Sequence, residues 1–510
     1  MLAKVHSCGL NGLEAYPVTI EVDVMRGLPS TIIVGLPDNA VKESKERVRS
    51  AIKNSGYKFG PKRITINLSP ADTKKEGPSF DLAIAIGVLA ATEQINPAHL
   101  DKYVLIGELS LDGRIQSVSG ALSVALSLKD APFHGLILPL ANAREAAVSY
   151  YTKIYPAKTL ADVIHFLNNP ENIQPFSPEP PALSEKPAPT DIDFSEVKGQ
   201  ISVKRGLEIA AAGGHNVLLI GPPGSGKSML AKRLPTILPD MNLEECLETT
   251  KIHSVMGLLK PGQSMVTCRP FRSPHHTSSG VALVGGGSMP KPGEVTISHN
   301  GVLFLDELPE FNRSALEALR QPLEDHCVTV ARASKTLRFP SKFMLVCAMN
   351  PCPCGWLTDP RKECHCHPPQ VQRYMAKISG PLLDRIDMHL DVPALPSKDI
   401  LSRAAAESSS KIKERTTSAR RIQQRRFENT QVFANAQMNH QQIQQFCMTD
   451  EEGGKLLKMA IEELKLSARA YDKILKIART IADLAGSGQI QTEHLAEAIQ
   501  YRNLDRNFFG

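Results

Sequence analysis

A chain of 510 residues is too long for one hydrophobic core, and we expect about three or four domains of roughly 100–200 residues each. Its composition, 42% hydrophobic and 22% charged residues, is ordinary for a soluble globular protein. The net charge of +6 is small for this length, so overall charge is no argument for a nucleic-acid partner, which must be inferred from local basic clusters.

No segment predicts export or membrane insertion. The first residues lack the long apolar run of a secretory signal. The longest apolar stretch, Phe80–Ala91, is too short to span a bilayer and contains Asp81. We therefore expect a cytoplasmic protein with no membrane partner. Its thiols would stay reduced, so clustered cysteines indicate a metal more than disulfides.

The pattern of predicted elements divides the chain. Residues 1–167 alternate strand-like and helical patterns, which predicts an α/β or α+β domain. Residues 168–191 carry seven prolines and predict an extended interdomain linker. Residues 192–395 hold three apolar strand patterns with helices between them. In residues 396–510 the strand signals vanish and helical patterns remain, with Ser467 and Thr492 as predicted N-caps.

The segment Gly221–Ser228, "GPPGSGKS", matches the phosphate-binding pattern G-x-x-x-x-G-K-[ST]. An apolar strand precedes it and a helix follows, so backbone N–H groups and the positive helix end would surround phosphate oxygens. Lys227 would neutralise the terminal phosphates of ATP, and Ser228 would ligate Mg²⁺. The predicted cofactor-binding residues are Gly221, Pro222, Pro223, Gly224, Ser225, Gly226, Lys227, Ser228 and Asp306.

Polar residues end the next two apolar strands. "VLFLDE" ends in Asp306, which suits Mg²⁺, and Glu307, which is placed to polarise the attacking water. The pair could be only a solvated strand end, but the phosphate loop upstream favours the catalytic interpretation. Asn350, after a third apolar strand, is suited to orient that water near the γ-phosphate.

Four of the ten cysteines fall within "CPCGWLTDPRKECHC", as Cys352, Cys354, Cys364 and Cys366. Two C-x-C pairs can supply the four ligands of a structural Zn²⁺ site, with His365 or His367 as a substitute for one thiolate. The alternative is four reduced, unligated cysteines. The stretch between the pairs has too few apolar residues to order itself, and a metal would supply that order.

Two arginines follow the cysteines. Arg385 lies among apolar residues in "SGPLLDRID", and Arg469 lies in the first turn of a predicted helix. Spacing alone leaves open whether each makes a structural ion pair or contacts nucleotide. If Arg385 is an arginine finger, it would act on the ATP of a neighbouring subunit, and head-to-tail contacts of that kind close into a ring.

Together these segments resemble the magnesium-chelatase-like branch of the AAA+ ATPases. "RPFRSPHHTSSGVALVGGGSMPKPGEVTISHNGVLFLDELPEF" narrows the resemblance to the YifB/ComM family, whose competence member resembles a hexameric branch-migration helicase. The resemblance implies a P-loop AAA+ αβα core, a C-terminal helical lid and a homo-hexamer. It also implies Lys227 and Ser228 as Walker A, Asp306 and Glu307 as Walker B, Asn350 as sensor 1, Arg385 as the trans finger and Arg469 as sensor 2.

The N-terminal domain is similar to the Lon-protease fold (ribosomal S5 domain 2-like), from "NLSPADTKKEGPSFDLAIAIGVLAA" onward. Ser79 occupies the position of the Lon nucleophile. Leu122 occupies the position of the Lon lysine, and leucine cannot activate a serine. We therefore expect no peptidase activity, which disfavours an ATP-dependent protease.

Three basic segments are candidates for a DNA backbone contact. The predicted hairpin His326–Phe339 carries Arg332 and Lys335, and the insert before the second strand carries Arg272, His275, His276 and Lys291. The helix Lys411–Arg426 holds seven basic residues and one acid, and it is equally well interpreted as a solvated face. We predict an ATP-dependent DNA helicase or branch-migration motor that acts on recombination intermediates in natural transformation. The alternative is a chelatase-type ATPase that remodels a protein partner.

Overall fold

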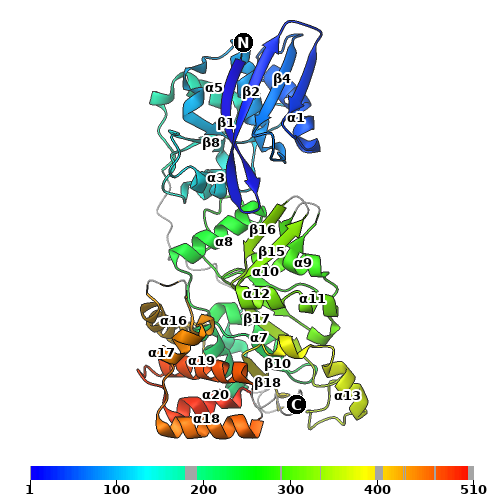
Figure 1. Ribbon diagram of the computed structural model, residues 1–510, viewed down its shortest axis with the longest axis vertical. Helices are drawn as coiled ribbons and strands as arrows, with labels where there is room; N and C mark the ends of the chain where they lie inside the picture. Colours follow the sequence, from blue (N-terminus) through cyan, green and yellow to red (C-terminus); the bar gives the residue numbers. More distant parts are fainter. Residues whose placement is uncertain are drawn as a thin grey trace. The chain divides into compact units, whose positions relative to one another are not determined.

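The computed structural model describes residues 2–177, 192–287, 290–332, 335–396, 406–428, 430, 432–464 and 467–502. The chain divides into two compact units (Figure 1). The first comprises Met1–Glu185 together with Leu243–Thr267, and the second comprises Lys186–Asn242 together with Cys268–Gly510.

The first unit is built on one seven-stranded mixed sheet, with apolar residues alternating along its longer strands. The strand order is β3 (Ser30–Val34), β4 (Arg63–Ser69), β2 (Glu14–Met25), β1 (Leu2–Asn11), β5 (Tyr103–Leu105), β8 (Gly135–Pro139) and β9 (Ile154–Ala157). Helix α2 (Asp81–Ala91) packs on β1 and β2, and α1 (Asn39–Asn54) packs on α2. Every residue of α2 is buried, which explains why this helix has the longest apolar run in the sequence.

A helix from the middle of the chain belongs to this first unit. Helix α8 (Leu243–Val255) packs on α3 (Ala121–Ser127). The buried carboxylate of Glu145 accepts hydrogen bonds from the Leu122 N–H (3.1 Å) and from the Ser254 hydroxyl of α8. Residues 243–267, which fall inside the predicted ATPase core of 192–395, thus belong to the first compact unit.

The second unit contains a parallel five-stranded sheet. The strand order is β11 (Phe271–Arg272), β14 (Val302–Leu305), β17 (Met344–Met349), β10 (Val217–Ile220) and β18 (Met388–Asp391). Strands β14, β17 and β10 are buried throughout. Parallel strands that are covered on both faces have continuous apolar sequences, as these three do. Helix α6 (Ile201–Gly213) packs against β18, α16 (Ser409–Arg426) and α19 (Ala468–Leu484).

The C-terminal part is helical, and among the described residues after Asp391 no strand occurs. The remaining helices are α17 (His440–Phe446), α18 (Glu451–Leu464) and α20 (Thr492–Gln500). The predicted cap Ser467 is confirmed, since its side chain accepts from the Ala470 N–H at 3.2 Å. The predicted cap Thr492 is wrong by one residue, because Gln491 caps α20 and pairs reciprocally with His494.

A hairpin precedes β17. Strands β15 (Cys327–Arg332) and β16 (Lys335–Pro340) pair antiparallel, with Arg332 opposite Lys335 at the turn. The hairpin predicted from the sequence is thus present. None of the described helices is long and apolar enough for a membrane crossing.

Candidate nucleotide site

The phosphate loop joins the end of β10 to α7 (Lys227–Arg233). Gly224 and Gly226 take positive φ angles of 76° and 93°, which side-chain-bearing residues rarely adopt. At Gly221 a Cβ atom would lie 2.2 Å from the carbonyl oxygen of Val392, the residue directly after β18. The loop therefore requires glycine for its turn and for its close approach to β18.

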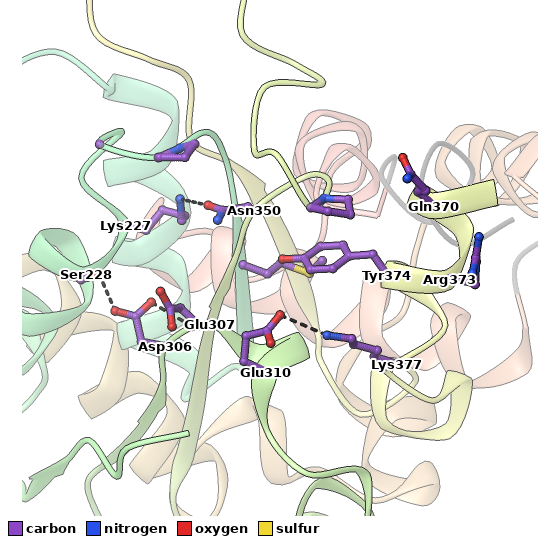
Figure 2. Close-up of a pocket in the computed structure, with 14 residues that line it drawn as sticks. Lys227, Ser228, Asp306, Glu307, Glu310, Asn350, Gln370, Arg373, Tyr374 and Lys377 are labelled. Carbon is purple, nitrogen blue, oxygen red and sulfur yellow. Dashed lines mark hydrogen bonds and ion pairs between the residues drawn. The ribbon is translucent and has the colours of Figure 1, made fainter. Parts of the chain in front are cut away.

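Lys227 lies in the site with its ammonium directed at Asn350 (Figure 2). Its buried ammonium donates to the carbonyl oxygens of Gly221 at 2.7 Å and Pro222 at 2.9 Å, and to Asn350 Oδ1 at 3.0 Å. Burial lowers the pKa of Lys227, and the nearby charge of Asp306 opposes this shift. The structure thus brings the predicted Walker lysine and the predicted sensor into direct contact.

The carboxylates lie on the neighbouring strand. Ser228 Oγ donates to Asp306 Oδ2 at 2.6 Å, while Asp306 Oδ1 accepts from the Glu307 N–H at 3.0 Å. A hydroxyl and a carboxylate this close fit one edge of an octahedral Mg²⁺ site, where oxygen ligands at about 2.0–2.1 Å from the ion are about 2.9 Å apart. Glu307 has a φ of 53°, an uncommon conformation for a non-glycine residue.

These residues line one cavity of about 710 Å³. Its wall consists of Pro223, Gly224, Lys227, Ser228, Asp306, Glu307, Glu310, Met349, Asn350, Pro353, Gln370, Arg373, Tyr374 and Lys377. Nucleotides need a pocket of this size, with a few polar groups converging on it.

Sequence reasoning missed one wall of the cavity. Gln370, Arg373 and Tyr374 come from α13 (Pro368–Met375), and Lys377 pairs with Glu310 at 3.1 Å (Figure 2). Burial, with the charge of Glu310, raises the pKa of Tyr374 to about 12. No motif marks these residues, because a long loop rather than a strand end brings them to the site.

The two predicted arginines lie outside this cavity. Arg385 is buried and its guanidinium pairs with Glu324 of α12 (Arg320–Asp325), while Arg469 Nη2 lies 3.6 Å from the same carboxylate. Hydrogen bonding from Arg385 lowers the pKa of Glu324, and the charge of Arg469 acts in the same direction. The structure therefore places Arg385 and Arg469 together, but not beside Lys227.

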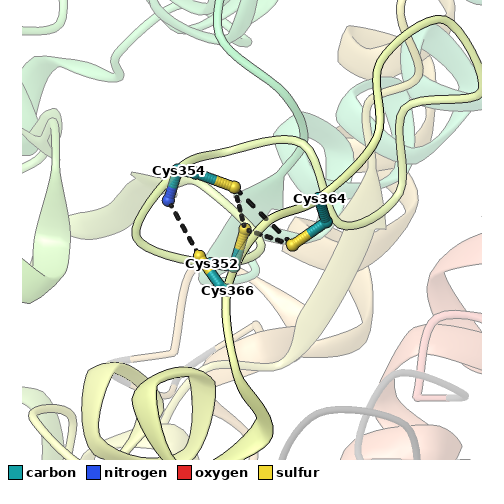
Figure 3. A group of neighbouring side chains, drawn as sticks. All are labelled: Cys352, Cys354, Cys364 and Cys366. Atoms are coloured by element: carbon teal, nitrogen blue, oxygen red, sulfur yellow. Dashed lines mark hydrogen bonds between the residues drawn. The ribbon is translucent and has the colours of Figure 1, made fainter.

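The four cysteines converge (Figure 3). Cys352 Sγ lies 3.4 Å from Cys354 Sγ and 3.7 Å from Cys364 Sγ, and the latter two are 3.6 Å apart. All four sulfur atoms lie within 4.8 Å of one another. A tetrahedral ion with Zn–S bonds of about 2.3 Å separates its sulfurs by about 3.8 Å, so the cluster fits Zn²⁺.

The cysteine loop packs directly on the nucleotide site. Gly355 has a φ of 85°, and a Cβ atom there would lie 2.5 Å from Pro223 Cδ of the phosphate loop and 3.7 Å from Asn350 Cγ. Backbone N–H groups of the same loop point to sulfur, with Gly355 N 3.2 Å from Cys352 Sγ. The conformation of this loop therefore bears on the position of the phosphate loop.

The predicted DNA contacts differ in their surroundings. Arg272 makes a bidentate pair with Glu294 at 2.6 and 2.8 Å, and His276 Nδ1 lies 3.5 Å from Glu307 Oε2. His275 and Lys291 are exposed. The backbones of Arg332 and Lys335 are described at the end of the hairpin, but their side chains lie outside what the structure describes.

The basic helix α16 makes extensive ion pairs within its own unit. Lys413 pairs with Asp240, Arg415 with Glu208 and Glu407, and Arg426 with Asp483. Arg420 is buried and donates to carbonyl oxygens of α6. These contacts favour a structural role for much of the helix over a DNA contact.

A parallel sheet that delivers a phosphate loop, a carboxylate pair and a polar sensor to one cavity defines the P-loop nucleotide-binding class. Three family models match the chain: "Magnesium chelatase, subunit ChlI" at residues 193–400, "Subunit ChlI of Mg-chelatase" at 20–142, and "Magnesium chelatase, subunit ChlI C-terminal" at 406–502. The chain is 44% identical to YifB of Salmonella typhimurium, over 99% of its own length and 98% of that protein.

It is 43% identical to the competence protein ComM of Haemophilus influenzae, again over 99% of this chain and 98% of that one. A shorter similarity, 27% identity over 30% of this chain and 20% of the other, links it to the Lon protease of Aquifex aeolicus. The chain belongs to the YifB/ComM family of magnesium-chelatase-like AAA+ proteins, a family that implies ATPase activity.

Replacing Gly355 with alanine should weaken nucleotide binding, because the new methyl group would displace Pro223 and the residue would keep a left-handed backbone. We expect a loss of about tenfold, or about 1.4 kcal/mol, in a fluorescent-nucleotide titration. Gly380→Ala is the matched control, since a Cβ atom there meets nothing within 4 Å. Equal affinities for both variants would contradict the proposed packing.

Proposed function

We propose that this chain is an ATP-driven motor that translocates DNA as a homo-hexameric ring in the cytoplasm. The observation that carries the proposal is the separation of Arg385 from the cavity that contains Lys227 and Glu307. A lone subunit then holds the groups that bind ATP and activate the attacking water. It lacks, at that site, the arginine that would stabilise the transition state. A neighbour that supplies Arg385 would complete the site, and repeated contacts of this kind close into a ring.

Each residue of the site has a proposed role. Lys227 would hold the β- and γ-phosphates, with Mg²⁺ between Ser228 and Asp306. Glu307 would accept a proton from the attacking water, and Asn350 would orient that water. Arg385 and Arg469 would meet the γ-phosphate of the adjoining subunit or stabilise the interface that surrounds it.

The DNA assignment rests on relatedness to a competence protein and on basic surface loops. We propose that the β15–β16 turn with Arg332 and Lys335, together with His275 and Lys291, faces the phosphate backbone. Such contacts are independent of base sequence and sensitive to salt. The substrates would be branched or single-stranded intermediates of recombination during natural transformation, and recombination proteins would be partners.

The second candidate is an ATPase that remodels a protein partner. It is favoured by the family models, which carry the name of a magnesium chelatase subunit. The Lon-like unit would serve either motor as a structural or guiding domain. Its Leu122 is fully buried in place of a catalytic lysine, which is our reason for proposing no peptidase activity.

A synthetic four-way junction separates the two candidates. With ATP, the purified chain should convert the junction into its duplex products, and Lys227→Ala should not. DNA should also raise the rate of ATP hydrolysis. Hydrolysis that no DNA stimulates, with the junction left intact, would favour the protein-remodelling alternative.

Mixed rings test the trans arginine. Arg385→Ala should lower kcat by about 10³-fold or more, as expected for an arginine finger. Lys227→Ala should be inactive as well. Mixing the two variants should restore measurable hydrolysis, because some interfaces then combine an intact lysine with an intact arginine. No recovery on mixing, with rings of normal size, would argue that Arg385 acts within its own subunit.

We propose that Zn²⁺ binds Cys352, Cys354, Cys364 and Cys366 and orders the loop between Asn350 and Arg385. Metal analysis should find about one zinc per chain, which Cys352→Ser with Cys354→Ser removes. Loss of zinc should weaken both ring assembly and ATP hydrolysis. Cys268→Ser, an exposed cysteine outside the cluster, is the control. Full assembly and hydrolysis without zinc would contradict a structural role for the ion.

A further inference from the structure

Glu307 has one side-chain partner among the residues that the structure describes. His276 Nδ1 lies 3.5 Å from Glu307 Oε2, and the two come from different strand connections. His276 follows β11, while Glu307 follows β14, and these strands pair in parallel with Arg272 beside Leu303. The sheet therefore brings the imidazole to the carboxylate.

The ring of His276 is itself held in place. Its centroid lies 4.1 Å from that of His275 and 6.5 Å from that of Phe311, whose ring plane is inclined at 78° to that of His276. Arg272, the last residue of β11, is held by its bidentate pair with Glu294, so the connection that carries His276 starts from a fixed position. Contacts with these two rings restrict the rotamers of His276, so it can hold a partner at low entropic cost.

Glu307 needs such a partner more than its neighbour Asp306 does. Asp306 is already bound by Ser228 and by a backbone N–H. The Glu307 carboxylate is exposed, its backbone is in a left-handed conformation, and a free side chain there would sample several rotamers. A general base must present one oxygen to the attacking water in a defined direction.

We propose that His276 is a positioning residue for Glu307. With ATP bound, the Nδ1–H of the imidazole would donate to Oε2, which lies 3.5 Å from Nδ1, and Oε1 would be left for the attacking water. His276 touches neither substrate nor water in this scheme and acts only through the carboxylate. This role replaces the DNA contact predicted for His276 from its sequence context, and it rests on the ATP hydrolysis proposed above.

Three substitutions at one position give a sharp test. His276→Ala should lower kcat about 10- to 100-fold with little change in KM, because a misplaced catalytic group slows the chemical step. His276→Asn should restore much of the loss, since its amide nitrogen lies where Nδ1 does. His276→Gln places its amide near the position of Nε2 and should restore less.

The control is His440→Ala, which removes an exposed histidine paired with a carboxylate, Asp472, at 3.4 Å and away from the cavity. It should hydrolyse ATP at the rate of the parent chain. Equal losses in the Ala, Asn and Gln variants, or a change in KM alone, would overturn the positioning role. A parent chain no more active than Lys227→Ala would overturn the ATPase proposal and this inference with it.

Discussion

The register between β10 and β17 is the constraint on which the nucleotide site depends. Ile220 pairs with Met349, and the next N–H, that of Gly221, donates to the Met349 carbonyl at 3.3 Å. Because the strands are parallel, the phosphate loop and Asn350 leave the same edge of the sheet side by side. The bond from Lys227 to Asn350 follows from this register, and a slip of one residue would turn Asn350 to the other face.

The parts of the site that the sequence predicted are those adjacent to buried strands. Lys227, Asp306 and Asn350 each follow a continuous apolar run, and the edge of a parallel sheet brings such positions together. The sequence could not predict in this way that Tyr374 lines the cavity or that His276 lies beside Glu307. Their positions depend on long connections whose paths are set by packing against the rest of the unit. The excursion of α8 into the first unit was missed for the same reason, since its helical pattern does not say which core it joins.

The cysteine cluster lies in a loop that contacts the phosphate loop. The loop that holds the four sulfurs also contributes Pro353 to the cavity and sets Gly355 against Pro223. A short polar loop cannot order itself by burying apolar area, so crosslinking by a metal would keep its contact with the phosphate loop constant. Its continuation, α13, contributes Tyr374 to the same cavity. One segment thus supplies several of the residues that line the nucleotide cavity.

Lys473 joins the helical region to the segment that carries Arg385. From α19 its ammonium donates to the Ile386 carbonyl at 2.9 Å and lies 3.4 Å from Asp387 Oδ1. Burial lowers the pKa of Lys473 to about 8, and the charge of Asp387 opposes this shift. Arg469 lies one turn earlier on the same helix, so α19 and the Arg385 segment must move together. A shift of α19 would therefore move both arginines in a single step.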